Sequence, residues 1–265
     1  MRRLKIDKSS VTGYLPAISL FVALMIIWQV VVTAFAIPSF FLPAPSRIIA
    51  DLLNPSYQWF KNTSATVYEA VAGFFLAVVL GLGLAVLMTL SERLRVLIYP
   101  FVITAQVIPK LAFIPILFIW LGFTSDFPRI FTVFLVCFFP VVVDSLAGMV
   151  SVEPDMVELV RSYTPSKIDL LRKALFPTAL PNIFAGLKVS ITLAVIGALV
   201  AEFVSSNQGL GFLIISAQVQ LDNTLAFAAA TLLVAVGLLL YIALELLERL
   251  MVPWKAHGSI STRST

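Results

Sequence analysis

Long apolar runs alternate with short polar segments along the whole chain of 265 residues. About 20 apolar residues in a helix suffice to cross the hydrocarbon core of a bilayer, and each run approaches or exceeds that length. A helix also satisfies its own backbone hydrogen bonds where no water is present. The pattern therefore predicts an all-α integral membrane protein with six transmembrane helices, at residues 15–37, 67–90, 96–121, 128–150, 182–204 and 224–251.

Lysine and arginine residues are unevenly distributed between these helices. With the N-terminus in the cytoplasm, 13 of the 18 basic residues fall on the cytoplasmic side and three on the outer side. The other two, Lys110 and Lys188, lie within predicted helices. Because cytoplasmic loops carry the excess of basic residues, both termini are predicted to be cytoplasmic. The first apolar run is too long for the core of a signal peptide, so we expect an uncleaved helix there.

Two outer segments are expected to contain short helices. In the first, residues 38–66, Ser46 is the predicted N-cap of a helix lying at the membrane surface. Its apolar side chains recur with helical spacing at Ile48, Ile49, Leu52 and Leu53. In the last outer segment two glycines mark a turn, and residues 212–219 are apolar enough to fold back into the membrane as a re-entrant helix.

The loop at residues 151–181 contains the stretch MVELVRSYTPSKIDLLRKALFP (156–177), which is more charged than its surroundings. Pro154 suits the first turn of one helix, whose apolar face is Met156, Leu159, Val160 and Tyr163.

After a Thr164–Pro165 corner, Ser166 is the predicted cap of a second helix, and Pro177 is predicted to end it. Its predicted apolar stripe is Ile168, Leu171 and Leu175. Such short helices are not stable alone in water, so they either lie on their own bundle and the membrane or dock into a partner protein.

Composition limits the chemistry of the chain. It is 60% hydrophobic and 12% charged, with a mean hydropathy of +1.02, which excludes an ordinary soluble domain. The single cysteine, Cys137, is expected to pack as a small buried hydrophobe. One histidine, His257, makes no metal site, and no nucleotide-binding motif is present. The chain is therefore not expected to be an enzyme or to bind nucleic acid, and any ATP must be bound by another chain.

Charged residues inside apolar helices are candidates for a transport path. Lys110 lies between Pro109 and Pro115, which predicts a kinked or broken helix whose charge faces the bundle, although a snorkelling or interfacial position is also open. Glu202 is expected near the outer mouth, where it lines an entrance, pairs with a partner subunit or ends the helix in solvent. Asp144 is predicted near the cytoplasmic end of its helix, and Lys188 is expected to snorkel.

The 156–177 stretch resembles the EAA loop of permeases from binding-protein-dependent ABC importers. Glu158 matches the conserved glutamate of that loop and Pro177 its final proline, while Arg161, Ser162 and Ser166 also fit. This sequence departs from the loop pattern at four positions: Leu159 and Val160 replace two alanines, Thr164 replaces a glycine, and Phe176 replaces a leucine. A left-handed corner is costly for threonine, so the turn is expected to differ.

The resemblance covers about residues 40–255 and is to the nitrate/sulfonate/taurine-type branch, which includes importers of thiamine-precursor pyrimidines and of riboflavin. It is carried by PSR (45–47), QVIPKLAFIPILFIWLGF (106–123), FFPVVVDSLAGM (138–149) and FAGLKVSITLAVIGALVAEFVSSNQGLGFLI (184–214). It implies a type I importer permease-like fold with six transmembrane helices and a cytoplasmic coupling helix-turn-helix. The residues implied to couple to an ATPase subunit are Glu158, Arg161, Ser162, Tyr163, Thr164, Pro165, Ser166 and Lys167.

The resemblance also implies partners and a location. The permease would act as a homodimer in the lipid of a bacterial inner membrane, with two ATPase chains that hold ATP and Mg and an external binding protein that delivers a small solute. No cofactor or metal is expected in this chain. The expected division is an N-terminal segment (1–66), a permease core (67–255) and a cytoplasmic tail (256–265).

Three other function classes are supported less well by the sequence, and each makes its own prediction. An ion-gradient-driven secondary transporter would need paired ionisable residues at mid-membrane and internal repeats. A membrane-embedded enzyme would need a cluster of catalytic side chains. A channel or scaffold without an ATPase would tolerate changes in the 156–177 stretch.

Overall fold

The computed structural model describes residues 8–123, 125–163 and 166–254. Within these ranges the chain is helical and contains no strand. It forms two compact units, each made of segments distant in sequence. One comprises the chain up to Trp59 together with Leu213–Thr231, and the other comprises Phe60–Phe212 together with the chain from Leu232 onward. Each boundary between the two units falls inside a helix.

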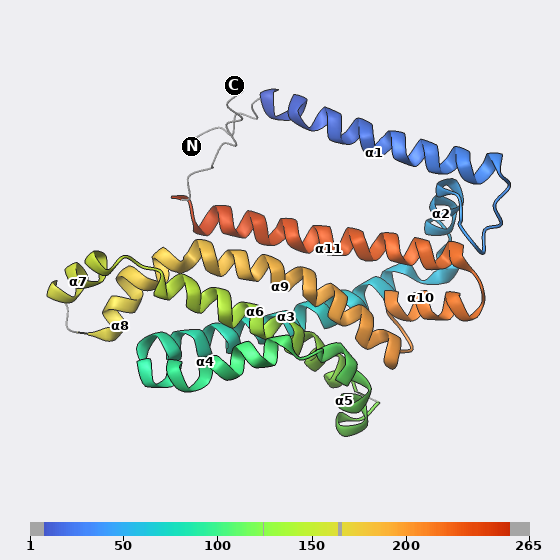
Figure 1. Ribbon diagram of the computed structural model, residues 1–265. Helices are drawn as coiled ribbons and strands as arrows, with labels where there is room; N and C mark the ends of the chain where they lie inside the picture. The colour runs from blue at the N-terminus through green and yellow to red at the C-terminus, as the bar shows by residue number, and fades with distance from the viewer. Residues whose placement is uncertain (1–7, 124, 164–165, 255–265) are drawn as a thin grey trace. The chain divides into compact units, whose positions relative to one another are not determined.

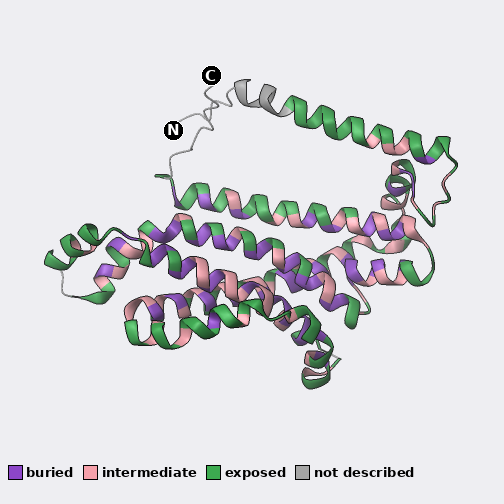
Figure 2. Cartoon of the chain, viewed as in Figure 1, coloured by how far each residue is buried: buried purple, intermediate pink, exposed green. Residues whose placement is uncertain are grey.

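The first unit contains α1 (Lys8–Ala34), α2 (Pro45–Leu52) and the short helix η1 (Pro55–Tyr57). Nearly all described side chains of α1 are exposed although they are apolar (Figure 2), as expected for a helix surrounded by lipid. The segment Leu213–Thr231 also belongs to this unit, and it contains the turn between the last two helices of the chain. There Ala217, Leu225 and Ala226 form a small core with Tyr57 and Trp59.

The predicted cap of α2 is wrong by two positions. The helix begins at Pro45, and Ala44 occupies the N-cap. Proline is favoured at the first helical position because its φ is already helical and its missing N–H has no intrahelical partner there. The backbone N–H of Ser46 donates instead to Gln29 Oε1 at 3.0 Å. Of the predicted stripe, Ile48 is buried and Leu52 is partly buried, whereas Ile49 and Leu53 are exposed.

The second unit is a bundle centred on three long helices: α3 (Trp59–Leu90), α6 (Phe127–Val150) and α9 (Phe176–Val204). Figure 1 shows α6 running beside α9 along most of its length. Small buried residues on α3 permit close approach to α6, since a Cβ on Gly73 would lie 2.5 Å from Val133 Cβ. Cys137 is fully buried as predicted, and its Sγ–H donates to Ser190 O at 3.1 Å between α6 and α9.

Shorter helices complete this unit. Between α3 and α6 lie α4 (Glu92–Val107), η2 (Lys110–Phe113) and α5 (Ile114–Leu121). Next come α7 (Pro154–Tyr163), α8 (Lys167–Leu170) and the π-helical turn η3 (Leu171–Leu175). The last two helices are α10 (Leu210–Val219) and α11 (Asn223–Met251), and each continues into the first unit.

The six predicted apolar segments correspond to five long apolar helices and one bent pair. The bent pair is the third segment, in which the helices 92–107 and 110–121 meet at 79°. α4 ends at Val107 because Ile108 precedes Pro109 and takes an extended conformation with ψ 132°. The break expected from the prolines is therefore confirmed. α10 is also helical, as expected for the last outer segment.

Pro177 was predicted to end the second helix of the 156–177 stretch, and this prediction is wrong. The chain remains helical from Lys167 to Val204, through both Pro177 and Pro181. The π-helical turn immediately precedes Phe176 and Pro177. A π turn contains one extra residue, and this makes room for a ring that would otherwise clash with the carbonyl four residues earlier.

Candidate functional site

The predicted two-helix stretch is present as α7 and α8. Ser166 is the N-cap of α8, and its Oγ accepts a hydrogen bond from the Asp169 backbone N–H at 3.4 Å, as predicted. Thr164 and Pro165, which were expected to form the corner, lie outside the described residues. α7 has no buried residue (Figure 2). This helix therefore contributes little to the core of its own unit.

The two faces of α7 have different surroundings. Val157 and Arg161 line a cavity of about 330 Å³ together with residues of α3, α4, α6, α8 and η3. Two members of the predicted apolar face point away from the unit, since Leu159 is 59% exposed and Tyr163 is 84% exposed. The other two face it in part: Val160 is partly buried, and Met156 Sδ accepts from Thr178 Oγ1 at 4.0 Å. An apolar surface on a short helix that its own unit leaves uncovered is suited to a partner protein.

The second helix packs through part of its predicted stripe, because Leu171 contacts the core of the unit and Leu175 is partly buried. Leu170 and Ala174 are its buried residues, whereas Ile168 is exposed. Lys167 reaches back to α3, where its Nζ donates to Leu90 O at 3.1 Å. Glu158, Ser162 and Ser166 are exposed. The described members of the predicted coupling set thus share one end of the bundle, and Arg161 and Lys167 line the same cavity.

Lys110 lies at the break of the bent pair, at the start of η2. Its Nζ donates to Gln106 O at 3.1 Å and lies 4.6 Å from the centre of the Phe139 ring. Among the residues that the structure describes, no carboxylate is within ion-pair distance of this amine. Lys110 also lines a cavity of about 270 Å³ with Gln106, Leu111, Val136, Pro140 and Leu193. Two of the three ammonium donors are thus available to a ligand.

Glu202 is buried, which excludes a solvated helix end at this residue. Its Oε1 accepts from the Thr66 hydroxyl at 2.6 Å, and its Oε2 accepts from the Gly211 N–H at 2.5 Å. The Leu210 N–H donates to Thr66 Oγ1 at 2.9 Å, and the Gly209 N–H donates to Asn62 Oδ1 at 2.8 Å. Side chains of α3 and α9 therefore cap the N-terminus of α10, which otherwise has unpaired N–H groups.

This capping arrangement requires glycine at residue 209. Gly209 has φ +116°, and a Cβ there would lie 2.4 Å from Glu202 Cδ. We expect Gly209→Ala to lower the free energy of unfolding by about 2–4 kcal/mol, through left-handed strain and overpacking. Thermal unfolding of the detergent-solubilised protein measures this. Gly83→Ala is the matched control, because nothing lies within 4 Å of that Cβ, and it should be neutral or slightly stabilising. Equal losses in the two variants would contradict the assignment.

Asp144 is half-buried where α6 crosses α9. A Cβ on Gly186 would lie 2.5 Å from Asp144 Cβ, so the two helices are in close contact at this point. The structure does not bring Asp144, Lys110 and Glu202 into one site. Each has its own surroundings, and the path role predicted for them stays a prediction.

Two ion pairs in the bundle were missed by sequence reasoning. Arg129 Nε donates to Glu69 Oε1 at 2.5 Å, and both side chains are buried. The same guanidinium bonds Asp126 and, at 3.1 Å, the Ser205 carbonyl. This ion pair could have been expected from Glu69, because an acidic residue inside an apolar transmembrane segment is usually paired with a basic residue.

Lys188 forms the second missed ion pair. Its Nζ pairs with Glu245 and, at 2.5 Å, with Glu248, two residues one turn apart on α11. The expected snorkelling of Lys188 is therefore wrong, because carboxylates within the bundle satisfy its charge. Among the described residues there is no group of three His, Cys, Asp or Glu side chains arranged to hold a metal ion.

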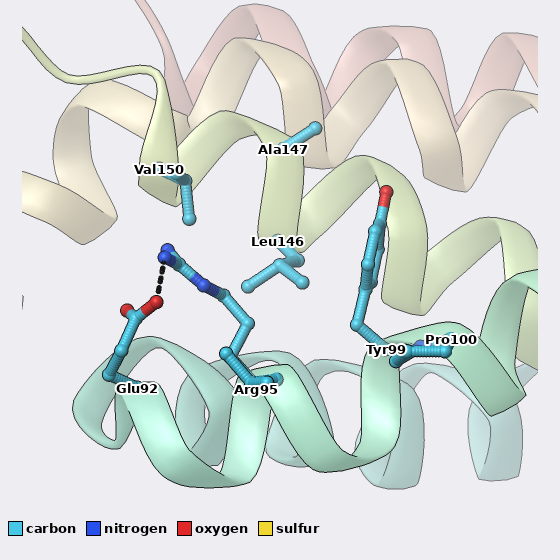
Figure 3. A pocket seen from close by; sticks show the side chains of 8 residues that line it. Glu92, Arg95, Tyr99, Pro100, Leu146, Ala147 and Val150 are labelled. Carbon is cyan, nitrogen blue, oxygen red and sulfur yellow. Dashed lines mark hydrogen bonds and ion pairs between the residues drawn. The ribbon is translucent and has the colours of Figure 1, made fainter.

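A groove of about 430 Å³ runs between α4 and α6, beside the cavity that Arg161 and Lys167 line. Figure 3 shows Arg95, paired with Glu92, at one end of the groove, and Tyr99 and Pro100 farther along it. The opposite wall is formed by Leu146, Ala147 and Val150. The groove is therefore mainly apolar, with a charged pair at one end.

Comparisons with known proteins relate this chain to transport proteins. Residues 77–253 match the profile of the family described as "Binding-protein-dependent transport system inner membrane component". The chain is 32% identical to the formylaminopyrimidine transport permease protein ThiX of Halalkalibacterium halodurans, over 89% of this chain and 94% of that protein. It is 33% identical to the riboflavin transport system permease protein RibX of Chloroflexus aurantiacus, over 91% of each.

A solved structure has a similar fold. It is a chain from the inward-facing MetNI methionine ABC transporter, with a TM-score of 0.61 and 18% identity. The match covers 75% of this chain and 99% of that one.

Proposed function

Because the chain belongs to the family of binding-protein-dependent transport system inner membrane components, we propose a specific role for its parts within an ABC importer. The chain is the permease subunit, a multi-pass protein of the inner membrane that is not itself a catalytic component. The family match removes the secondary transporter as the leading alternative. The proposed role has three components: a coupling surface, a set of partners and a cargo.

The proposed coupling surface is the exposed apolar face of α7 together with α8. The observation that carries this assignment is that α7 is helical and amphipathic yet buries none of its residues. A ten-residue helix is marginal in water without packing partners, so an external surface must cover it. A separate ATPase subunit that holds ATP and Mg would supply that surface at the cytoplasmic side. On this proposal both termini lie in the cytoplasm.

The proposed assembly contains two copies of this chain, two ATPase chains and an external binding protein. One copy has a single coupling surface, so two copies are needed to engage two ATPase chains. The external binding protein is proposed because the family name states dependence on a binding protein. The proposed cargo is a small solute with a nitrogen heteroaromatic ring. Two relatives more than 30% identical to this chain are named for formylaminopyrimidine and riboflavin, which both contain such rings.

Co-purification tests the assembly. The chain carrying a C-terminal tag is extracted from its native membrane in mild detergent, and the accompanying proteins are identified by mass spectrometry. A stoichiometric ATPase subunit is the expected result. A chain that purifies alone, under conditions that keep other membrane complexes intact, would contradict the proposal.

We expect Lys110 to contact the cargo as it passes. The Lys110 ammonium has no carboxylate at ion-pair distance within the described ranges, and beyond its bond to Gln106 O it can donate to a ligand in the cavity that it lines. Lys110→Met should reduce transport in reconstituted vesicles about tenfold, the effect of losing one hydrogen bond to a polar ligand, while the ATPase subunit stays bound. The matched control is Lys61→Met, a surface lysine in the first turn of α3. Equal transport by both variants would remove Lys110 from the path.

A further inference from the structure

Two cavities adjoin where α4 and α6 meet α7 and α8. The first, of about 330 Å³, is lined by polar and apolar residues of α3, α4, α6, α7, α8 and η3. The second is the 430 Å³ groove between α4 and α6 (Figure 3). Glu92, Arg95 and Val150 line both. The two cavities therefore form one continuous site with a polar part and an apolar part.

The polar part carries an excess of positive charge. Arg95, Arg161 and Lys167 line it, and Glu92 is the one carboxylate among its described lining residues. Glu92 pairs with Arg95 at 2.5 Å. Within the described ranges, neither Arg161 nor Lys167 has a carboxylate at ion-pair distance. The first turn of α4 borders the same cavity, and the N-terminus of a helix also favours negative charge. An anionic group is the ligand chemistry that fits.

The apolar part has the chemistry of an acyl-chain site. Val96, Tyr99 and Pro100 form one wall, and Leu146, Ala147 and Val150 form the other. These residues belong to helices that cross the membrane, singly or as part of the bent pair. Val96 is 66% exposed and Val150 is 48% exposed, so the groove opens to its surroundings. Tyrosine is also common where the hydrocarbon region meets the headgroups.

We propose that this composite site binds an anionic phospholipid. The phosphate lies among Arg95, Arg161 and Lys167, and one acyl chain lies in the groove between α4 and α6. A lipid accounts for both parts together, whereas a soluble partner would reach only the polar part. The lipid would belong to the cytoplasmic leaflet; this placement rests on the proposed function, because it uses the cytoplasmic location proposed there for α7 and α8. The bound lipid would connect α7 and α8 to α4 and α6.

Native mass spectrometry of the purified protein, with whatever subunits accompany it, tests the site. The probes are phosphatidylglycerol and phosphatidylcholine with identical acyl chains. We expect preferential retention of phosphatidylglycerol. Arg95→Gln should weaken its binding about fivefold, since a basic residue near an anionic lipid surface contributes on the order of 1 kcal/mol. Glu92→Gln removes a carboxylate from the site and should strengthen binding. Arg93→Gln, on the same helix but outside the lining, is the matched control.

Ala147→Trp tests the apolar half, because its indole fills the groove. It should weaken phosphatidylglycerol binding without changing the binding of glycerol phosphate, which has no acyl chain. The proposal is overturned by equal retention of the two lipids, by equal effects of Arg93→Gln and Arg95→Gln, or by lipid binding that Ala147→Trp leaves unchanged. Loss of the ATPase subunit in Ala147→Trp with normal lipid binding would instead assign the groove to a polypeptide. Lipid retention is measurable even on a chain that purifies alone, so this test is independent of the co-purification result.

Discussion

Replacing Arg129 by methionine is expected to destabilise the bundle by roughly 3–5 kcal/mol, because Glu69 then remains buried as an unpaired charge. The Glu69 side chain is 2% exposed and that of Arg129 is 7% exposed, so water cannot replace the lost partner. The guanidinium also bonds Asp126, the N-cap residue of α6, and the carbonyl of Ser205, the C-cap residue of α9. One substitution thus removes contacts among α3, α6 and the end of α9.

Thermal unfolding in detergent measures this effect, and a double variant identifies its cause. Glu69→Met combined with Arg129→Met removes both charges and fills a similar volume, so it should recover much of the stability. Arg93→Met is the matched control, since Arg93 is exposed on α4 and should change stability by less than about 0.5 kcal/mol. If the double variant were no more stable than Arg129→Met alone, the ion pair would not be the source of the loss.

Placing a charge on the exposed face of α7 should abolish transport while leaving the fold intact. Leu159 is 59% exposed, so Leu159→Asp leaves the core of the bundle unchanged. A buried carboxylate at the centre of a docked apolar face would instead cost several kcal/mol and weaken binding of the ATPase subunit by two orders of magnitude or more. Transport in reconstituted vesicles and co-purification of the ATPase subunit measure the two consequences.

Leu53→Asp is the control for this substitution. Leu53 is 80% exposed after α2, in a segment predicted to lie on the outer side, so the ATPase subunit should stay bound. Thermal unfolding of Leu159→Asp should match that of the unmodified protein. A Leu159→Asp variant that retains the ATPase subunit and transports normally would show that this face is not the coupling surface.

Periodicity was sufficient to predict most helices, because each apolar run satisfies its hydrogen bonds within one segment. Short sequence motifs also predicted local structure correctly. Ser166 caps a helix through the backbone N–H three positions later, and Pro109 breaks the third apolar segment. These features are set by neighbours in the chain and can be read without knowledge of packing.

The errors concern contacts between distant segments. Glu69 and Arg129 are 60 positions apart, and their pairing depends on how α3 and α6 align. Lys188 was expected to snorkel because its two glutamate partners lie on another helix. Pro177 was expected to stop a helix, but a π turn inserted before it keeps the helix continuous. The capping of α10 by Asn62, Thr66 and Glu202 could not be predicted from neighbouring residues either, because the acceptors lie on α3 and α9.

The buried position of Cys137 has a practical consequence. Maleimide and thiosulfonate reagents react with a solvated thiolate, and this sole cysteine of the chain is fully buried with its Sγ–H bonded to Ser190 O. The natural sequence can therefore serve directly as the background for site-directed labelling. A single cysteine introduced at Leu159 or Arg93 would carry a fluorophore or spin label at the coupling end without first removing the native thiol from the contact between α6 and α9.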